Sequence, residues 1–172
     1  LWRHECFRVY GDRLIDEVDT DRFGEIIGRV TRNNFEDLDQ DELQASPLIF
    51  SNFAIPAAQD EKVYFQIDTY DRLKKTLQGK LGEYNESNAK MDLVLFEQAM
   101  EHVTRIARII DNPRGNAMLV GVGGSGKQSL TKLAAFISGY TTFSIKLTST
   151  YNMSDFKADV LALYQKAGLK GE

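Results

Sequence analysis

The chain has few of the features that stabilise secreted or membrane-bound proteins. It contains one cysteine, Cys6, so no disulfide can form within it, and such sparse use of cysteine is typical of a reducing compartment. No apolar run approaches the length needed to span a bilayer, and the N-terminus lacks the basic and then apolar pattern of a secretory signal. We therefore expect the cytosol or a compartment continuous with it, and no membrane.

An excess of basic residues is also missing. The 21 Lys and Arg are outnumbered by 25 Asp and Glu, which gives a net charge of −4. Lys and Arg residues do not form a basic stripe in any one segment. The sequence therefore argues against nucleic acid or an anionic membrane as a direct partner. With 172 residues, 42% of them hydrophobic, the chain is long enough for one globular domain with a sizeable core.

The most informative segment is a glycine-rich run that fits the phosphate-loop pattern G-x-x-x-x-G-K. Glycines let backbone N–H groups converge on a polyphosphate, the following helix adds a positive dipole, and the lysine adds a charge. The residues before the run, 117–120, have the pattern of a buried strand, and those after it, 130–138, have the pattern of a helix. This context predicts binding of ATP or ADP by Gly121, Val122, Gly123, Gly124, Ser125, Gly126, Lys127, Gln128 and Ser129.

Gln128 departs from the usual pattern, in which a Ser or Thr after the lysine offers a hydroxyl to Mg²⁺. Gln128 has an amide oxygen on a longer side chain. Ser129 has the hydroxyl but lies one position later, rotated by about 100° around a helix axis. We therefore predict that Mg²⁺, where it binds, is reached by Gln128 or Ser129, and that nucleotide binding does not imply efficient hydrolysis. No catalytic residue can be assigned.

Elsewhere the pattern alternates between helices and short apolar runs. Residues 1–35 are expected to be helical, 36–47 a linker, and 48–53 and 63–67 loops or edge strands. Helices are expected at 70–84, 91–110 and 154–167, and a strand at 142–147. The apolar faces predicted for the helices comprise Phe23, Ile26, Ile27 and Val30; Tyr70, Leu73, Leu77, Leu81 and Tyr84; Phe96, Ala99, Met100, Val103, Ala107 and Ile110; and Phe156, Val160 and Leu163.

This order matches the opening half of a doubly wound α/β nucleotide domain. P-loop enzymes need a later strand that ends in an acidic residue, and Glu172 has no apolar strand around it. The sequence therefore predicts truncation at the C-terminus and, because the first helical piece is too short to fold alone, at the N-terminus too.

Other polar and aromatic residues are better explained by packing or solvation than by chemistry. His102 has no second His or Cys at ligand spacing, and Cys6 has no histidine near it in sequence apart from His4. Arg3 and His4 could face a nucleotide of a preceding module, but packing is the commoner role for such residues. The aromatic residues Phe50, Phe53, Tyr64 and Phe65 are expected to belong to the core. The acidic residues Asp37, Asp39, Asp41 and Glu42 lack the spacing of a calcium-binding loop and are expected to form a solvated linker.

Several motifs together resemble one family. Tyr84-Asn85-Glu86, the run from Met91 to His102, Arg105-Ile106 and the run from Pro113 to Ala117 leading into the phosphate loop resemble an axonemal dynein heavy chain at the start of its fourth AAA+ module. Gln128 after Lys127 is also similar to that family. Residues 1–5, 8–9 and 12–14 resemble the helical lid that ends the third module. The resemblance covers nearly the whole chain and is densest from Tyr84 to Ser138.

The resemblance implies an incomplete P-loop NTPase fold of the three-layer AAA+ type. Residues 1–47 would be a lid fragment of the preceding module plus a linker. Residues 48–172 would be the N-terminal part of a nucleotide-binding module, ending before its acidic Walker B strand. In that family the AAA+ modules form a ring in which the first module is the principal site of ATP hydrolysis, whereas the third and fourth are chiefly regulatory. The adenine pocket would be lined partly by residues 63–67.

The resemblance also implies a setting. The parent would be a minus-end-directed microtubule motor that drives ciliary or flagellar beating, located in the cytoplasm and cytoskeleton, at the axoneme. Its partners would be neighbouring AAA+ modules of the same heavy chain, microtubules reached through parts outside this chain, and dynein intermediate and light chains.

Three functions remain open from the sequence. The first is a regulatory ATP- or ADP-binding module of a dynein motor, which binds nucleotide without hydrolysing it alone. The second is a self-contained P-loop enzyme such as a small kinase, which would need a catalytic acid that the sequence does not reveal. The third is a structural ring spacer whose loop is empty or permanently filled. Exchange of bound nucleotide with solution distinguishes the first from the third.

Overall fold

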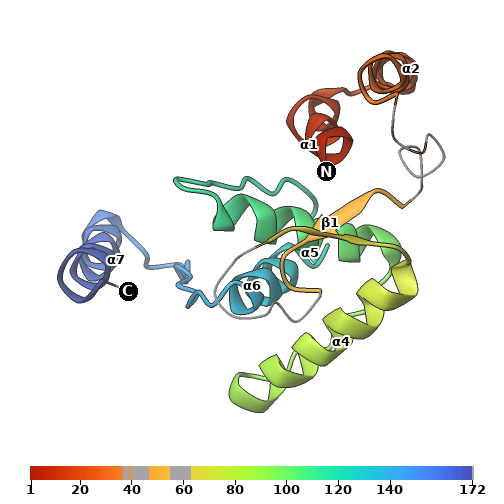
Figure 1. The fold of residues 1–172 in the computed structure, drawn as a ribbon. Coiled ribbons are helices and arrows are strands. Elements are labelled where there is room, and N and C mark those ends of the chain that lie inside the picture. The colour runs from red at the N-terminus through yellow and green to blue at the C-terminus, as the bar shows by residue number, and fades with distance from the viewer. Residues whose placement is uncertain (37–38, 40–46, 55–62, 172) are drawn as a thin grey trace.

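The computed structural model describes residues 1–36, 39, 47–54 and 63–171 (Figure 1). Within this part of the chain, no helix is long and apolar enough to cross a membrane. The elements, in order, are α1 (Trp2–Val9), the 3₁₀ turn η1 (Gly11–Arg13), α2 (Glu17–Asn34), β1 (Ile49–Ser51), β2 (Phe65–Ile67), α4 (Tyr70–Ser87), α5 (Glu97–Asp111), α6 (Lys127–Ile137), α7 (Met153–Gln165) and the π turn η2 (Lys166–Lys170).

The first two helices form a pair at the N-terminal end. Asp16 begins α2 by accepting a 2.8 Å hydrogen bond from the Asp19 N–H, which satisfies one of the free donors at a helix start. Phe7 of α1 and Phe23 of α2 meet edge to face with ring centroids 5.3 Å apart. The predicted inner face of α2 is confirmed at Ile27, which is buried, but Ile26 is 41% exposed because it lies at the edge of that face.

The segments at 48–53 and 63–67 form a small antiparallel sheet. Strand β1 pairs with β2 in the register Ile49 to Ile67, Phe50 to Gln66 and Ser51 to Phe65. All three residues of β1 are buried, whereas β2 buries only Ile67. The edge-strand prediction for these two runs is therefore confirmed.

The hydrophobic core lies where α4, α5 and α6 pack together at the centre of the molecule (Figure 1). Leu73 and Leu77 of α4 and Leu133 of α6 have no exposed surface. Burying a leucine in this way contributes about 1.5 to 3 kcal/mol per side chain. Tyr84 and Phe136 close one end of the core with an edge-to-face contact at 5.4 Å. These contacts hold helix α6 firmly against α4.

The predicted helix at 91–110 starts later than expected. Helix α5 begins at Glu97, and residues 91–96 precede it without helical structure, with an extended backbone at the N-cap Phe96. The side chain of Asn85 holds this segment, because it accepts a 2.7 Å hydrogen bond from the Met91 N–H and donates one of 3.1 Å to the Met91 carbonyl. Phe96, predicted to face the core, is 59% exposed. Helix α4, in turn, runs to Ser87 rather than ending at Tyr84.

The two strands predicted around the phosphate loop are absent from the structure of these residues. Neither 117–120 nor 142–147 is a strand, and Met118 and Val120 are 85% and 87% exposed. A strand requires a ladder of backbone hydrogen bonds with a neighbour. Among the described residues, only β1 and β2 form such a ladder. The strand prediction is therefore wrong here for want of a pairing segment among the described residues.

The last helix forms close to where it was predicted but does not bury its apolar face. Asn152 caps α7 by accepting a 2.7 Å hydrogen bond from the Ser154 N–H, and Asp155 accepts from the Asn152 N–H in return. Phe156 and Leu163 were expected to face inward, yet they are 44% and 38% exposed. The reason is that α7 lies apart from the three core helices, joined to them by an extended segment (Figure 1).

Candidate functional site: the phosphate loop

The glycine-rich run forms a turn that only glycine adopts easily. Gly124 and Gly126 have φ angles of 78° and 79°, in the left-handed region that costs other residues about 1 to 2 kcal/mol. Gly126 is the N-cap of α6, and its carbonyl accepts a 2.9 Å hydrogen bond from the Leu130 N–H. Leu130 and Leu133 anchor α6 in the core with 6% and 0% exposure. The loop is thus placed at the N-terminus of a firmly packed helix.

Lys127 folds its ammonium group back over the loop. Its Nζ donates hydrogen bonds of 2.6 Å to the Gly121 and Val122 carbonyls and of 3.0 Å to Ser125 Oγ. A Cβ at Gly121 would lie 3.2 Å from Ser125 Oγ and 3.4 Å from Lys127 Nζ, so the loop closes tightly around this charge. A fixed positive charge at a helix N-terminus is suited to bind phosphate.

Two cavities border the loop. The first, of about 500 Å³, lies between α5 and residues 117–122; the second, of about 490 Å³, lies beside the start of α6. Lys127 lines both of them. The lining residues are His102, Arg105, Ile106, Ile109, 117–122, Ser125, Lys127 and Leu130 for the first, and Leu119, Lys127, Gln128, Thr131, Lys132 and 141–144 for the second.

The two residues predicted to reach a metal differ in their placement. Gln128 is exposed and lines the second cavity together with Lys127. Ser129 is half-buried and lines neither cavity. An amide oxygen is a ligand type that Mg²⁺ accepts, so the arrangement favours Gln128 of the two.

Residues 63–67, expected near an adenine, line neither of the two loop cavities. Their last three residues form β2, and Ile67 is buried in the core. Of the four acidic residues predicted to form a solvated linker, only Asp39 is among the described residues; Asp37, Asp41 and Glu42 lie outside them. The assignment of an adenine pocket to residues 63–67 stays a prediction.

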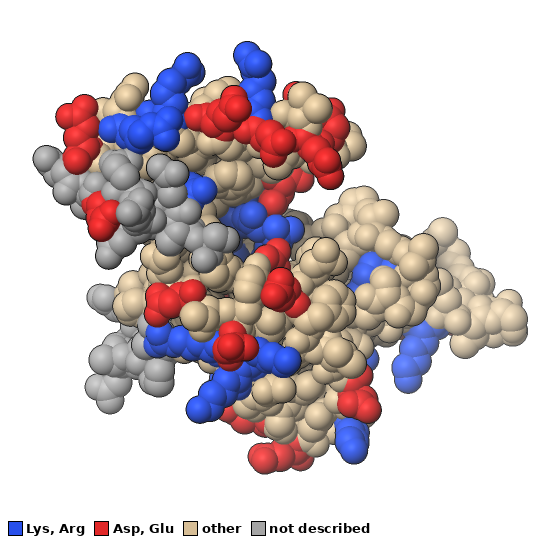
Figure 2. All heavy atoms as spheres, turned by 90° about the vertical axis from the view of Figure 1, so that its right-hand side faces the viewer, with Lys and Arg blue, Asp and Glu red and all other residues tan. Residues whose placement is uncertain are grey.

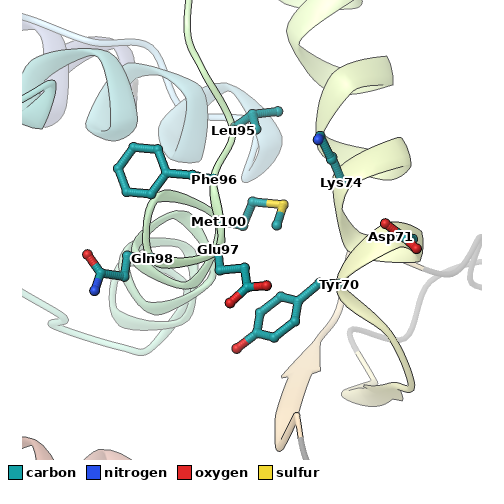
Figure 3. A pocket seen from close by; sticks show the side chains of 8 residues that line it. All are labelled: Tyr70, Asp71, Lys74, Leu95, Phe96, Glu97, Gln98 and Met100. Atoms are coloured by element: carbon teal, nitrogen blue, oxygen red, sulfur yellow. The ribbon is translucent and has the colours of Figure 1, made fainter.

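A further cavity, of about 490 Å³, lies between the first turn of α4 and the N-terminus of α5 (Figure 3). Tyr70 stands at its edge and donates a 2.5 Å hydrogen bond to Glu101. This bond to a carboxylate, with burial and the charges of Glu101 and Glu97 adding to it, raises the pKa of Tyr70 to about 12. The cavity shares no lining residue with the two at the phosphate loop.

The sequence analysis missed the polar contacts that join the N-terminal helices to the rest. His4 donates from Nδ1 to the Leu48 carbonyl at 3.0 Å, and Glu5 pairs with Arg108 through both carboxylate oxygens. Asp12 Oδ1 lies 3.7 Å from Arg105 Nη2. His4 is only 6% exposed, which agrees with the packing role preferred for it. No local pattern reveals such pairs, because their members are far apart in the sequence.

Comparisons with known proteins agree with this arrangement. Residues 91–172 match the family described as the P-loop containing dynein motor region D4, and residues 1–45 match the AAA+ lid domain. The chain is 56% identical to the dynein beta chain of the flagellar outer arm from Chlamydomonas reinhardtii. It is 48% identical to the ciliary dynein beta chain from Tripneustes gratilla and 48% identical to dynein axonemal heavy chain 17 from Homo sapiens.

Each of these three alignments covers 99% of this chain and 4% of the relative, so the chain spans about 4% of the length of the curated relatives that it matches. The lid match ends close to the predicted boundary at residue 47, although that boundary itself stays a prediction. The expected AAA+ fold, incomplete and preceded by a helical lid segment, agrees with both family matches. The chain therefore belongs to the dynein heavy-chain family.

Proposed function

We propose that the chain is an ATP- or ADP-binding segment of a dynein motor ring, within a regulatory AAA+ module. The observation that carries this proposal is the position of Lys127, whose ammonium is held over a glycine-rich turn at the N-terminus of α6. The ammonium is bound there by two carbonyls and a hydroxyl, none of which is ionised. A polyphosphate would offer it a full negative charge, and charge-assisted hydrogen bonds are roughly twice as strong as neutral ones.

Four residues of the loop have assigned tasks in this proposal. Gly124 and Gly126 give the backbone its left-handed turns, which let successive N–H groups converge on the phosphates. Lys127 supplies the charge, and the dipole of α6 adds to it. Gln128 would hold Mg²⁺ through its amide oxygen, since it borders the same cavity as Lys127. When bound, the metal would neutralise part of the phosphate charge.

The regulatory role in this proposal rests on the resemblance to the fourth AAA+ module, which is chiefly regulatory in that family. The described residues that line the two loop cavities supply groups suited to bind a nucleotide. Bound nucleotide would shift the equilibrium between conformations of the module. The size of that shift is set by the difference between the affinities of the conformations for the nucleotide. The neighbouring AAA+ modules of the same heavy chain would receive that change.

The remaining expectations concern the whole protein. We propose a minus-end-directed microtubule motor at the axoneme of a cilium or flagellum, in the cytoplasm and cytoskeleton. Microtubules would be reached through parts outside this chain, and dynein intermediate and light chains would be further partners. The names of the relatives, which refer to flagellar, ciliary and axonemal dyneins, support this setting.

Equilibrium binding of ATP and ADP, with and without Mg²⁺, tests the proposal in a full-length heavy chain that carries this segment. The expected result is that the heavy chain binds nucleotide that exchanges with solution. Lys127→Ala should bind one nucleotide fewer per heavy chain, because losing the lysine weakens binding at this site by about 1.5 to 3 kcal/mol. Lys90→Ala, which removes an exposed lysine away from the loop cavities, is the matched control and should leave the stoichiometry unchanged.

Other outcomes would favour the alternatives. A nucleotide equivalent that depends on Lys127 but never exchanges would indicate a structural spacer with a permanently filled loop. No equivalent at this site in a folded heavy chain would indicate a spacer with an empty loop. Phosphoryl transfer to a small acceptor, abolished by Lys127→Ala, would indicate a kinase-like enzyme.

A further inference from the structure

The N-terminal helical pair is held to the rest of the molecule by polar contacts from α1 and from the η1 turn that follows it. Basic and acidic side chains meet where these helices, at the top of the view, adjoin the remainder (Figure 2). Three residues carry the contacts: His4 reaches the Leu48 carbonyl, Glu5 pairs with Arg108, and Asp12 lies near Arg105. A cavity of about 270 Å³ lies along the same boundary. Whatever changes these contacts changes how α1 is docked.

His4 is the residue at this boundary that titrates closest to neutral pH. It is 6% exposed, and its ring lies 5.3 Å from the ring of Phe50 on β1. Because a carbonyl oxygen can only accept, His4 Nδ1 must carry the hydrogen that is donated to Leu48. Nε2 is buried and has no hydrogen-bond partner among the described residues. The bond to Leu48 can form in either protonation state, but the buried and unpartnered Nε2 favours the neutral imidazole with its proton on Nδ1.

We propose that His4 makes the docking of α1 pH-sensitive: the neutral ring joins α1 to residue 48, and protonation at Nε2 loosens the helix. Protonation would create a buried donor and a buried charge at once. The nearest carboxylate oxygen is Glu5 Oε1, 3.8 Å from Nε2, which is beyond hydrogen-bond distance. That oxygen already accepts from Arg108. The protonated ring would compete with Arg108 for the carboxylate that anchors α1.

The other charges around His4 do not remove this conflict. Burial opposes a positive ring most, whereas the hydrogen bond to the Leu48 carbonyl favours it; Arg8 and Arg108 also oppose it and Glu5 favours it. On balance the pKa of His4 is lowered from its ordinary value. Tyr64, ahead of β2, interacts with Glu5 and Arg108 rather than with His4 itself. The titratable and charged side chains that line the same cavity are Arg3 and Arg8 of α1, Tyr70 of α4, and Glu101 and Arg105 of α5.

The sign of the effect follows from the lowered pKa. Between the ordinary histidine pKa of 6.5 and the lower value in the docked state, the undocked ring binds a proton and the docked ring does not. Docking is therefore strongest above pH 6.5 and weakens as the pH falls below it. If the docked ring stays neutral, the undocking equilibrium rises by about tenfold from pH 7.5 to pH 5.5.

Hydrogen exchange of the α1 amides in the full-length heavy chain, corrected for the intrinsic pH dependence of exchange, tests this inference. Wild-type protection over Trp2–Val9 should fall by a factor approaching ten between pH 7.5 and pH 5.5. In His4→Asn, whose amide can still donate to Leu48 but does not titrate, the fall should vanish. The matched control is His102→Asn, which removes the only other histidine, an exposed residue on α5, and should keep the wild-type fall.

A second measurement does not depend on whether His4→Asn folds. Exchange of the imidazole C2 hydrogen in the wild-type protein, followed by mass spectrometry, gives the pKa of His4 directly, and a value below 6.5 is expected. A value of 6.5 or above would overturn the proposal. So would flat protection in the wild type, or an equal fall in the wild type and in His4→Asn.

Discussion

Arg108 Nε donates a 3.0 Å hydrogen bond to Glu5 Oε1, and Arg108 Nη2 contacts Glu5 Oε2, across 103 positions of the sequence. Two-point contact between a guanidinium and a carboxylate fixes orientation as well as distance. The Arg108 side chain is 19% exposed and that of Glu5 is 35% exposed, so water screens the pair only in part. This pair therefore sets the position of α1 against α5 more strictly than an exposed ion pair would.

The substitution Arg108→Gln should lower the free energy of unfolding by about 1 to 3 kcal/mol, because it leaves Glu5 without its charged partner in a half-buried place. Denaturant unfolding of the chain measures the loss. Lys80→Gln breaks an exposed pair with Glu83 on α4 and serves as control, with an expected loss below about 0.5 kcal/mol. If Arg108→Gln costs as little as Lys80→Gln, the contact with Glu5 does not hold α1 in place.

Acid should weaken the same contact. The hydrogen bond from Arg108 is the main cause that lowers the pKa of Glu5 below its ordinary value of 4.5. A lowered carboxyl pKa stabilises the folded protein above pH 4.5, and this stabilisation is lost as the pH falls through the folded pKa. The wild type should therefore lose more stability than Glu5→Gln over this acid range. Parallel curves of unfolding free energy against pH for the two proteins would exclude the effect.

Local signals in the sequence predicted much of the fold and of the site. The glycine-rich turn, a helix after it and the buried faces of α4 and α6 all follow from glycine placement or from helical spacing, although α6 begins at Lys127 rather than at the predicted residue 130. Such signals act over a few residues, so a single sequence carries them. Contacts between distant residues were missed for the same reason, as with Glu5 and Arg108.

The errors share a physical cause, which is that a pattern does not reveal what will pack against it. Residues 117–120 have the composition of a buried strand, but among the described residues no segment pairs with them. The apolar face of α7 has the right spacing, yet Phe156 stays exposed. Residues 91–96 alternate in burial, with Leu95 inside and Val94 outside, which is the period of an extended segment rather than of a helix.

The left-handed turn at Gly126 should be essential for binding. Gly126→Ala places a Cβ on a residue with a φ of 79°, although the space around it is open. The cost is then one of backbone conformation, about 1 to 2 kcal/mol, which should weaken ATP binding about 5- to 30-fold if the loop must keep this turn. Gly79→Ala on α4, also in open space but without a positive φ, should bind ATP as the wild type does. Equal affinities in both variants would mean that the loop binds in another conformation.

A hydroxyl at position 128 should increase the dependence of ATP affinity on Mg²⁺. Gln128→Thr restores the residue type that normally offers its hydroxyl to Mg²⁺ in phosphate loops. We expect the ratio of ATP affinities with and without Mg²⁺ to be larger in Gln128→Thr than in the wild type. Ser129→Ala, which changes a residue that lines neither loop cavity, should leave that ratio unchanged. The same ratio in Gln128→Thr and the wild type would mean that the metal is held elsewhere.

Asn85 should determine where α5 begins. Its side chain pairs with both backbone groups of Met91, as a neighbouring strand would, and so keeps residues 91–96 out of the helix. Asn85→Ala leaves a half-buried N–H and C=O without their partner, for an expected loss of about 1 to 3 kcal/mol in the free energy of unfolding. It should also raise the exchange rate of the Met91 amide. Asn34→Ala, which removes an exposed hydrogen bond at the end of α2, is the control, and a similar loss in both variants would contradict the role assigned to Asn85.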